Sequence, residues 1–458
     1  MAYLIPTAIL AAVSFLVLAF SKRNFQTPQE HFLGHPGEAA ILASNVSGAF
    51  TVTTFWVLFI FSIKSWSLPS FIALQAGIAA AYIFYAVLLM GNVQSKTFLN
   101  LIFGDDPPIV LRRIFFGLAL LGIVVELGLG RAIVEALLVS HGQPTWIGTA
   151  SIALLGLLTI LYTYSGGMFA VILTDAVFVV LCLVVIALLG LSLQTIPAME
   201  GIRTDIATYD FSRLSVLDGL FYSSAASYVF LMFLFHPDFW YRNLRLPYIS
   251  KGRRILTIVL SALSTSALLQ VAYVIGASSR TDTDRALLYN NLINKDYDLQ
   301  SVLNLLEMFF HHDYSAIGLI FLILVSAFTT VSSLIISAVA GYYETDQISG
   351  ADRYKALLTE FFKLTIVITI VALTFDIATG IFVALIVASS QLTLTSSIIG
   401  ARAYRLARSS YLPAILLSIV FFIVLAAVNV LASLHLYYPF IAIVSSAVAP
   451  AIIWILRR

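Results

Sequence analysis

Apolar runs follow one another along almost the whole chain, and this pattern decides what the chain can fold into. A helix that crosses the hydrocarbon core of a bilayer needs about 20 predominantly apolar residues, which is the length of these runs. Of the 458 residues, 60% are hydrophobic and 10% are charged. A soluble domain carries about 25% charged residues and cannot hide so much apolar surface. The alternating pattern of a membrane barrel is absent. The sequence therefore predicts an all-α polytopic membrane protein.

Thirteen runs qualify as membrane-spanning helices, and most of the connections between them are short. The predicted spans are residues 2–20, 37–60, 69–90, 109–139, 146–164, 167–194, 218–237, 252–278, 315–343, 355–375, 377–401, 411–433 and 437–456. With the N-terminus outside, the cytoplasmic segments hold seventeen Lys and Arg residues of the 25 in the chain, and the outer segments hold six. Because cytoplasmic loops are enriched in Lys and Arg, this bias predicts an N-out, C-in topology.

Five hydroxyl side chains gather in the stretch SAFTTVSS, which lies in the middle of an apolar span. Helical spacing places four of them on one face, namely Ser326, Thr329, Thr330 and Ser333. Such hydroxyls can bond back to carbonyls of their own helix or join neighbouring helices. Four on one face near the bilayer midplane can also bind a monovalent cation, because hard cations prefer oxygen ligands. Both interpretations stay open on the residues alone.

Two further stretches place polar groups at membrane depth. The second span contains ASNVSG at residues 43–48, where two Ser, an Asn and a Gly interrupt an apolar helix. We expect this segment to be unwound, with carbonyls that face a cavity or an ion. The stretch YTYSGGMFAVILTD carries a Gly pair that predicts a tight cytoplasmic turn, and Asp175 lies about two helical turns beyond it. An ionisable group at that depth is functional by default.

Together these three stretches resemble the solute:sodium symporter family, and YTYSGGMFAVILTD resembles that family's most specific signature. The resemblance covers nearly the whole chain. It implies a LeuT-like fold, in which two inverted five-helix repeats form a single transmembrane domain over residues 1–458. Repeat one would be 37–194 and repeat two 218–401, with peripheral helices at 2–20 and 411–456.

The resemblance also implies a sodium ion between the second and ninth spans. Its ligands would be the carbonyls of Ala43, Val46 and Ser326 and the hydroxyls of Thr329 and Thr330. Asp175 would line the inner exit route of that ion. Six side chains are candidates for contact with the substrate: Ser44, Asn45, Ser47, Glu126, Tyr228 and Gln391.

Glu126 lies near the bilayer midplane and has no close basic neighbour on its own helix, so it is a candidate for substrate contact or for proton coupling. Arg131 and Glu135 are spaced i, i+4 near the outer end of the same span. We interpret these two residues as a structural ion pair.

The function predicted from these residues is a sodium-coupled symporter that imports a sugar, an amino acid or a carboxylate by alternating access. Its partners would be the small-molecule substrate and the lipid bilayer of a plasma or bacterial inner membrane. The alternatives are proton coupling through Glu126 and a non-transporting membrane sensor on the same scaffold. The scattered basic residues do not suggest nucleic-acid binding, and the sequence predicts no obligate protein partner. No hydrolase, metalloenzyme or phosphate-loop motif is present, so we expect no enzyme activity.

Overall fold

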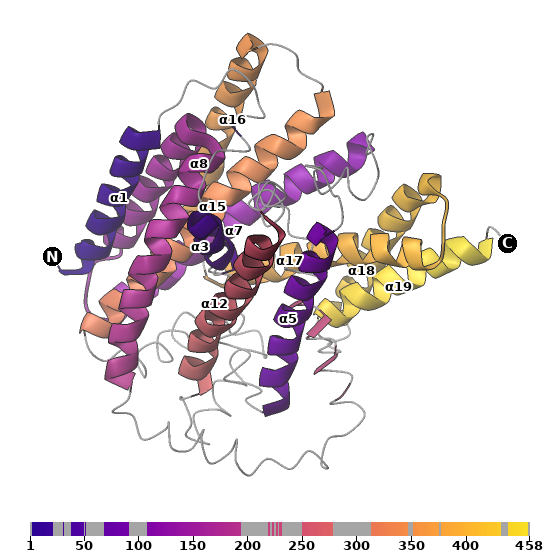
Figure 1. The fold of residues 1–458 in the computed structure, drawn as a ribbon, viewed down its shortest axis with the longest axis horizontal. Coiled ribbons are helices and arrows are strands. Elements are labelled where there is room, and N and C mark those ends of the chain that lie inside the picture. The colour runs from indigo at the N-terminus through magenta and orange to yellow at the C-terminus, as the bar shows by residue number, and fades with distance from the viewer. Residues whose placement is uncertain are drawn as a thin grey trace.

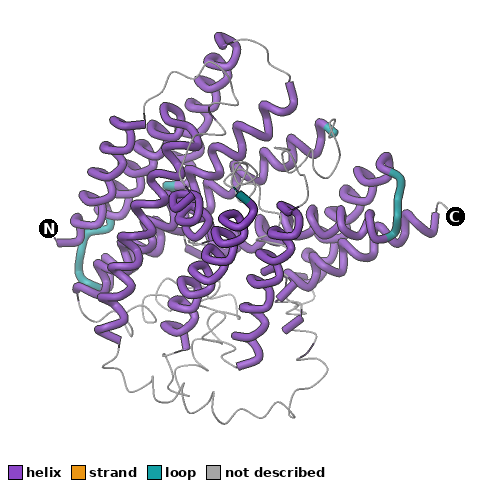
Figure 2. Tube along the Cα trace, viewed as in Figure 1, coloured by secondary structure: helices purple, strands orange, loops and turns teal. Residues whose placement is uncertain are grey.

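Helices make up every secondary-structure element that the structure describes (Figure 2). The computed structural model describes residues 2–21, 31, 38–49, 51, 68–90, 108–193, 219, 222–223, 226–227, 229–230, 250–277, 313–346, 351–374, 377–431 and 438–456. Within these ranges the all-α prediction is confirmed. The long predicted connection 195–217, all but the last two residues of the long predicted connection 279–314, and most of the predicted span 218–237 lie outside the described residues.

The helix bounds agree with the apolar runs (Figure 1). The N-terminal half contains η1 (Ala2–Leu4), α1 (Ile5–Ser21), α3 (Glu38–Ala49), α5 (Leu68–Met90), α7 (Ile109–Ser140) and α8 (Trp146–Leu193). The C-terminal half contains α12 (Lys251–Ala277), α15 (Asp313–Asp346), α16 (Ala351–Ala372), α17 (Ile377–Ala403), η4 (Arg408–Ser410), α18 (Tyr411–Leu431) and α19 (Tyr438–Leu456). Apart from α3, whose predicted continuation lies outside the described residues, the helices begin and end within about one turn of their predicted bounds.

Gly167 divides α8 into the two segments that were predicted as the fifth and sixth spans. Its backbone is non-helical, with φ 56° and ψ −150°. Only glycine adopts this region without strain, because a Cβ atom would clash with the backbone. A Cβ at Gly167 would also lie 2.4 Å from the carbonyl oxygen of His31, so the connection between α1 and α3 approaches this point closely. The predicted helix break at the Gly pair is confirmed.

The central element of the fold is α15. Every side chain from Leu319 to Val339 is buried. The helix packs against α7 and α8 over long stretches, and α1, α3 and α16 also contact it (Figure 1). A helix that is enclosed on all sides has no face left for lipid. Polar groups on α15 must therefore find partners inside the protein or bind a ligand.

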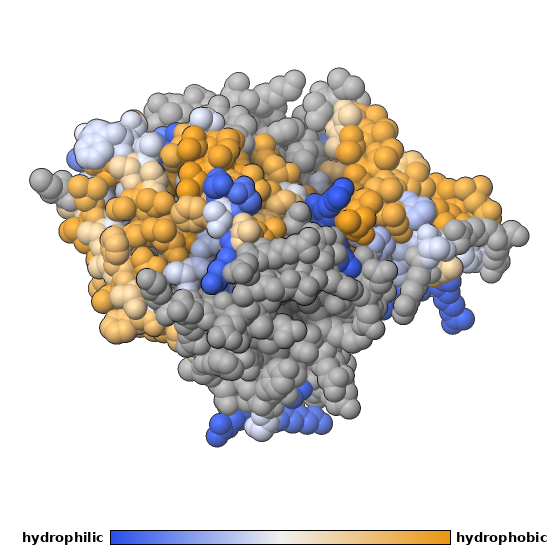
Figure 3. All heavy atoms as spheres, turned by 90° about the horizontal axis from the view of Figure 1, so that it is seen from above, coloured by the Kyte–Doolittle hydropathy of each residue, from blue (hydrophilic) through white to orange (hydrophobic). Residues whose placement is uncertain are grey.

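Apolar side chains cover large parts of the described surface on the face shown in Figure 3, as expected for a protein surrounded by lipid. Large apolar side chains are exposed on α1, α12, α16 and α18, among them Phe15, Phe20, Leu263, Ile370 and Ile423. Four described helical stretches are long and apolar enough to cross a bilayer: Ala2–Ser21, Trp146–Leu188, Ala316–Val339 and Tyr411–Asn429. The chain is an integral membrane protein.

Apart from α1, which packs on α8 and α15, the long described helices pack in three sets. The first, here called the α15 group, contains α7, α8, α15 and α16, which all contact one another. In the second, the α3 group, α12 packs against both α3 and α5. The third contains α17, α18 and α19, and α17 also packs on α7. The two groups meet where α3 lies against α8 and α15. The predicted repeat boundaries at 37–194 and 218–401 stay a prediction.

Candidate ion site at the junction of α3, α8 and α15

The hydroxyl face of α15 is buried along its whole length. Its four predicted members, Ser326, Thr329, Thr330 and Ser333, are each no more than 2% exposed. A regular helix carries them at successive turns, so their oxygens lie on one side of a helix that has no lipid-facing surface. The sequence prediction of a continuous polar face is confirmed.

These hydroxyls donate hydrogen bonds to carbonyls of their own helix. Thr330 Oγ1 donates to the carbonyl of Ser326 at 2.8 Å, and Ser333 Oγ donates to that of Thr329 at 2.9 Å. The hydroxyl of Ser326 donates to the carbonyl of Ile323 at 2.9 Å. The self-bonding interpretation is therefore correct for α15. It is compatible with cation binding, because a hydroxyl that donates its proton keeps its oxygen lone pairs for a ligand.

The carbonyl of Ser326 accepts two side-chain hydroxyls, as does the carbonyl of Thr329. Besides the bond from Thr330, the Ser326 carbonyl accepts the hydroxyl of Thr329 at 3.2 Å. A carbonyl oxygen has two lone pairs, so sodium would compete with these donors for the Ser326 carbonyl. The hydroxyl oxygens of Thr329 and Thr330 are the better candidates for ligands on α15.

The prediction that residues 43–48 are unwound is wrong. The structure has a helix from Glu38 to Ala49, which includes the whole ASNVSG stretch, and Thr51 is the next described residue outside a helix. Polar side chains do not break this helix, because neighbouring helices satisfy them. The carbonyl of Ala43 lies within the helix interior. Val46 lies in the last described turn of this helix and is 2% exposed.

Ser44 and Asp175 form a hydrogen bond across the contact between α3 and α8. The Ser44 hydroxyl donates to Asp175 Oδ2 at 2.6 Å, and both side chains are fully buried. A carboxylate at this depth requires donors, and a hydroxyl that donates to a charged oxygen makes a short, strong bond. This contact assigns Ser44 to the environment of Asp175 on the predicted ion route.

Asn45 faces a different neighbour from Ser44. Its amide donates to Ser261 Oγ on α12 at 3.4 Å. Sequence analysis missed Ser261, although a signal exists in the i, i+4 series of buried hydroxyls formed by Thr257, Ser261 and Thr265. The last of these is 2.9 Å from the Tyr82 hydroxyl of α5. Hydroxyls at this spacing mark the face of α12 that contacts α3 and α5.

The remaining predicted substrate residues are only partly placed by the structure. Glu126 lies on α7 and is 4% exposed. Ser47 and Gln391 lie on α3 and α17, but their side chains are outside the described part of the structure. Tyr228 is also outside the described residues. Their role as substrate contacts stays a prediction.

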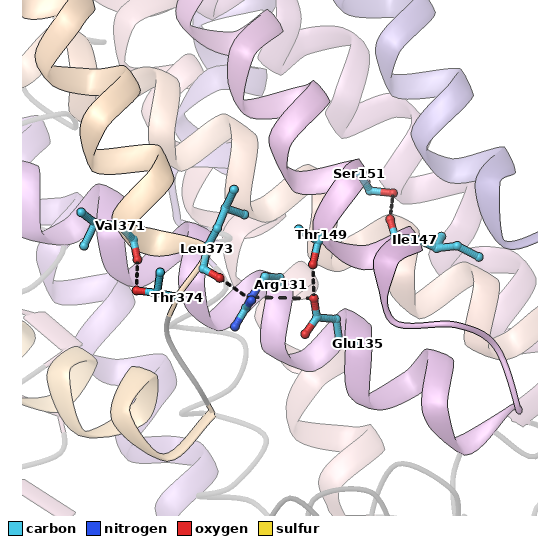
Figure 4. Close-up of polar contacts among 8 residues, drawn as sticks. All are labelled: Arg131, Glu135, Ile147, Thr149, Ser151, Val371, Leu373 and Thr374. Atoms are coloured by element: carbon cyan, nitrogen blue, oxygen red, sulfur yellow. Dashed lines mark hydrogen bonds and ion pairs between the residues drawn. The ribbon is translucent and has the colours of Figure 1, made fainter.

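A second polar cluster joins α7, α8 and the end of α16 (Figure 4). Arg131 Nε and Glu135 Oε1 are 3.8 Å apart, which confirms the predicted i, i+4 ion pair. Thr149 donates to Glu135 at 2.5 Å, and Arg131 donates to the carbonyl of Leu373, one residue beyond α16. Gly148 allows this arrangement, since a Cβ there would lie 2.7 Å from Glu135 Cγ. The cluster holds helices of the α15 group together.

Solved structures of transporters share this arrangement of helices. The chain is similar to a Na⁺-coupled sialic acid symporter in a substrate-bound outward-open state, described as revealing a novel Na⁺ site. The TM-score is 0.66 and the identity 15%, over 100% of this chain and 98% of that chain. It is also similar to Mhp1, a nucleobase-cation-symport-1 family transporter in a closed conformation with bromovinylhydantoin bound. That TM-score is 0.52 and the identity 12%, over 95% of this chain and 94% of that chain.

The chain has a LeuT-like fold. Both of the solved structures are of transporters, and the match to each extends over nearly the whole length of both chains. A scan against protein-family models finds no match, and a search of curated proteins finds no relative. At these identities the likeness establishes the fold, and the function has to be argued from the site. The buried hydroxyl face belongs to α15, and α3 packs against that helix.

Proposed function

We propose that the chain is a sodium-coupled symporter of the solute:sodium symporter family, which imports a small polar organic solute by alternating access across a plasma or bacterial inner membrane. The observation that supports this most strongly is the fully buried hydroxyl face of α15, next to α3, in a fold shared with a Na⁺-coupled symporter. The hydroxyls on this face donate to carbonyls of α15 itself, and their oxygen lone pairs stay available to a cation.

The proposed ligands suit sodium because they are neutral oxygens. Thr329 and Thr330 supply hydroxyl oxygens, and Val46 supplies a carbonyl from the last described turn of α3. Ala43 and Ser326 complete the set implied by the family resemblance. A neutral set of hydroxyls and carbonyls matches a hard monovalent cation, whereas a divalent cation requires several carboxylates. The carboxylate of Asp175 is linked to this set through Ser44, the residue that follows Ala43, because the Ser44 hydroxyl donates a hydrogen bond to it.

The substrate class is inferred from the same fold and from the polar side chains near the middle of the protein. One neighbour is described as a sialic acid symporter and the other has bromovinylhydantoin bound, and both compounds are small polar organic molecules. Candidate contacts in this chain are Asn45, Ser47, Glu126, Tyr228 and Gln391. Side chains of this kind can donate to and accept from hydroxyl, amide and carboxylate groups of a solute.

The experiment that tests sodium dependence is a thermal-stability series on the purified protein. A ligand that binds only the folded state stabilises it by about 2.7 kcal/mol at a concentration of one hundred times its dissociation constant. We expect the melting temperature to rise with sodium chloride, and not with choline chloride or potassium chloride at equal ionic strength. Equal melting temperatures in all three salts, from micromolar to molar concentration, would contradict sodium binding.

Proton coupling through Glu126 is a second candidate, because this acidic side chain is 4% exposed inside a membrane protein. An acidic group at that depth can carry a proton between the two sides when the protein changes conformation. In that case the melting temperature would follow pH and would be indifferent to sodium. The same salt series, repeated at several pH values, separates the two candidates.

A further inference from the structure

Positive charge is concentrated in the set formed by α17, α18 and α19. From residue 377 to residue 458 the sequence contains five Arg and no Lys, Asp or Glu, so this part of the chain has a formal net charge of +5. Two of these arginines, Arg402 and Arg405, are exposed at the end of α17 and in the turn that follows it. The set has no acidic side chain of its own to offset their charge, and its exposed end therefore attracts anions.

The turn after α17 has the backbone hydrogen bonds of a Schellman motif. The amide of Leu406 donates to the carbonyl of Ala401 at 2.9 Å, and the amide of Arg405 donates to that of Arg402 at 2.9 Å. Arg405 occupies the left-handed position of the motif, with φ 51°, where glycine is the usual residue because a Cβ atom is unfavourable there. Among the described residues it is the only non-glycine residue with a positive φ. An arginine at this strained position favours a role for its guanidinium group.

An aromatic pair lies beside these arginines. The ring centroids of Tyr404, at the start of the turn, and Trp454, in the last turn of α19, are 6.0 Å apart. This contact places the end of α17 next to the end of α19 (Figure 2). Tyr and Trp are enriched where the hydrocarbon core of a membrane meets the polar lipid headgroups. The pair therefore indicates that Arg402 and Arg405 lie at the level of the headgroups.

Exposed apolar side chains continue from the arginines along the same helices. Ile399 lies on α17 about one turn before Arg402, Ile455 and Leu456 lie at the end of α19, and all three are exposed. A basic end that joins an apolar face matches the two parts of an anionic phospholipid, which are a phosphate group and hydrocarbon chains. A second copy of this chain fits poorly, because the same surface would bring arginines against arginines.

We propose that the ends of α17 and α19 form a binding surface for an anionic phospholipid. Arg402 and Arg405 hold its phosphate group, Tyr404 and Trp454 lie against its glycerol region, and the acyl chains follow the exposed apolar side chains toward the middle of the bilayer. In the predicted N-out, C-in topology this surface faces the cytoplasmic leaflet, where anionic lipids attract basic residues near the membrane. The inference concerns the lipid that surrounds the protein and does not depend on which ion or solute the protein carries.

The test measures the melting temperature of the purified full-length protein in nonionic detergent micelles and sodium-free choline buffer. Dioleoyl phosphatidylglycerol is added in increasing amounts, with dioleoyl phosphatidylcholine as the neutral control lipid and inorganic phosphate as the soluble anion. A ligand that binds the folded state raises the melting temperature as its concentration increases. We expect a saturable rise with phosphatidylglycerol alone, and the concentration that gives half of this rise measures the apparent affinity.

Arg405→Gly is the decisive variant, because it removes the guanidinium group and also relieves the left-handed backbone. It should melt at least as high as the parent in phosphatidylcholine. It should also need at least about fivefold more phosphatidylglycerol for half of the rise, as expected for one basic residue at an anionic membrane surface. Arg402→Gln, which leaves the residue in the left-handed position unchanged, should show the same loss of affinity. Arg405→Lys keeps the charge, and Arg113→Gln changes an exposed arginine on α7 as the matched control; both should stay within about twofold of the parent.

The lipid surface is overturned if Arg405→Gly and Arg402→Gln keep the response of the parent to phosphatidylglycerol, or if Arg113→Gln loses as much affinity as they do. It is also overturned if phosphatidylcholine or inorganic phosphate raises the melting temperature as much as phosphatidylglycerol, since the surface would then bind any lipid or any anion. A melting temperature of Arg405→Gly below that of the parent in phosphatidylcholine would show that the guanidinium group stabilises the fold itself, and would contradict a role in lipid binding.

Discussion

The hydroxyl of Thr330 donates to the carbonyl of Ser326, 2.8 Å away and one turn earlier on α15. This bond turns the proton of the hydroxyl toward the helix backbone and leaves the oxygen lone pairs for another partner. Thr329 makes a longer bond to the same carbonyl, at 3.2 Å. Two adjacent threonines held in this way present two oxygens, which is the local arrangement that the proposed sodium site requires.

Substitution of Gly167 by Ala should destabilise the protein by about 2 kcal/mol or more. The backbone at Gly167 adopts a region that other residues enter only with strain, and the new Cβ would lie 2.4 Å from the His31 carbonyl oxygen. Gly117→Ala on α7 is the matched control, because no atom lies within 4 Å of its Cβ position. The measurement is the melting temperature of both variants in detergent. Equal stability of the two variants would show that the close approach at Gly167 is unimportant.

Replacement of Arg131 by Met should cost about 1–3 kcal/mol of stability. The change removes the donor to the Leu373 carbonyl and the cation beside Glu135, and both partners are partly buried. Arg113→Met changes an exposed arginine on the same helix and should have little effect. Thermal unfolding of the two variants side by side gives the difference. A loss in Arg113→Met as large as that in Arg131→Met would reject the cluster as a stabilising contact.

The stability of the protein should fall as the pH drops from about 6.5 toward 4, because of His31. Burial lowers the pKa of this imidazole to about 4, against backbone hydrogen bonds to Tyr164 and Thr163 that act in the opposite direction. The unfolded chain has an ordinary histidine pKa near 6.5 and binds the proton first, so acid favours unfolding. At pH 5 the loss is about 2 kcal/mol.

His31→Gln should remove this component, so the melting temperature of the variant should change less between pH 7 and pH 5 than that of the parent. All other histidines, including His141, are the same in the parent and in the variant, so the comparison isolates His31. The same pH dependence in parent and variant would show that other groups cause the acid instability.

Glu126→Gln should leave the sodium dependence of the melting temperature unchanged. The variant keeps the shape and most of the hydrogen bonding of this buried side chain and removes only its ability to exchange a proton. If the coupling ion is a proton, the parent should show no sodium effect, and Glu126→Gln should weaken the pH dependence of the melting temperature while leaving the part caused by His31. The salt and pH series on the two proteins decides between the ions.

The helices were readable from the sequence because bilayer thickness sets the length of each apolar run. The hydroxyl face of α15 and the Arg131–Glu135 pair were readable for a similar reason, since both depend on spacing within a single helix. The break at Gly167 follows from the glycine pair itself. In each case the controlling interaction is local along the chain.

The sequence alone could not predict that α3 is helical through residues 43–48, because this depends on contacts between segments far apart in the chain. Ser44 and Asn45 look like helix breakers in a lipid environment, but Asp175 and Ser261 accept their hydrogen bonds. The Ser44–Asp175 pair is separated by 131 positions in the sequence, and no periodic pattern links the two. Polar residues within a span thus identify a site, while the helix geometry depends on which neighbours satisfy them.

Direct binding of radioactive sodium to the purified protein is the most direct test of the proposed cage. We expect saturable binding that unlabelled sodium chloride displaces and choline chloride does not. Thr329→Val and Thr330→Val remove one ligand oxygen each at nearly constant volume and should weaken binding at least about tenfold. Ser337→Ala, which removes a hydroxyl bonded to Ser333 on the same helix, should bind like the parent. The absence of saturable binding in the parent, or unchanged affinity in both threonine variants, would contradict a sodium site on α15.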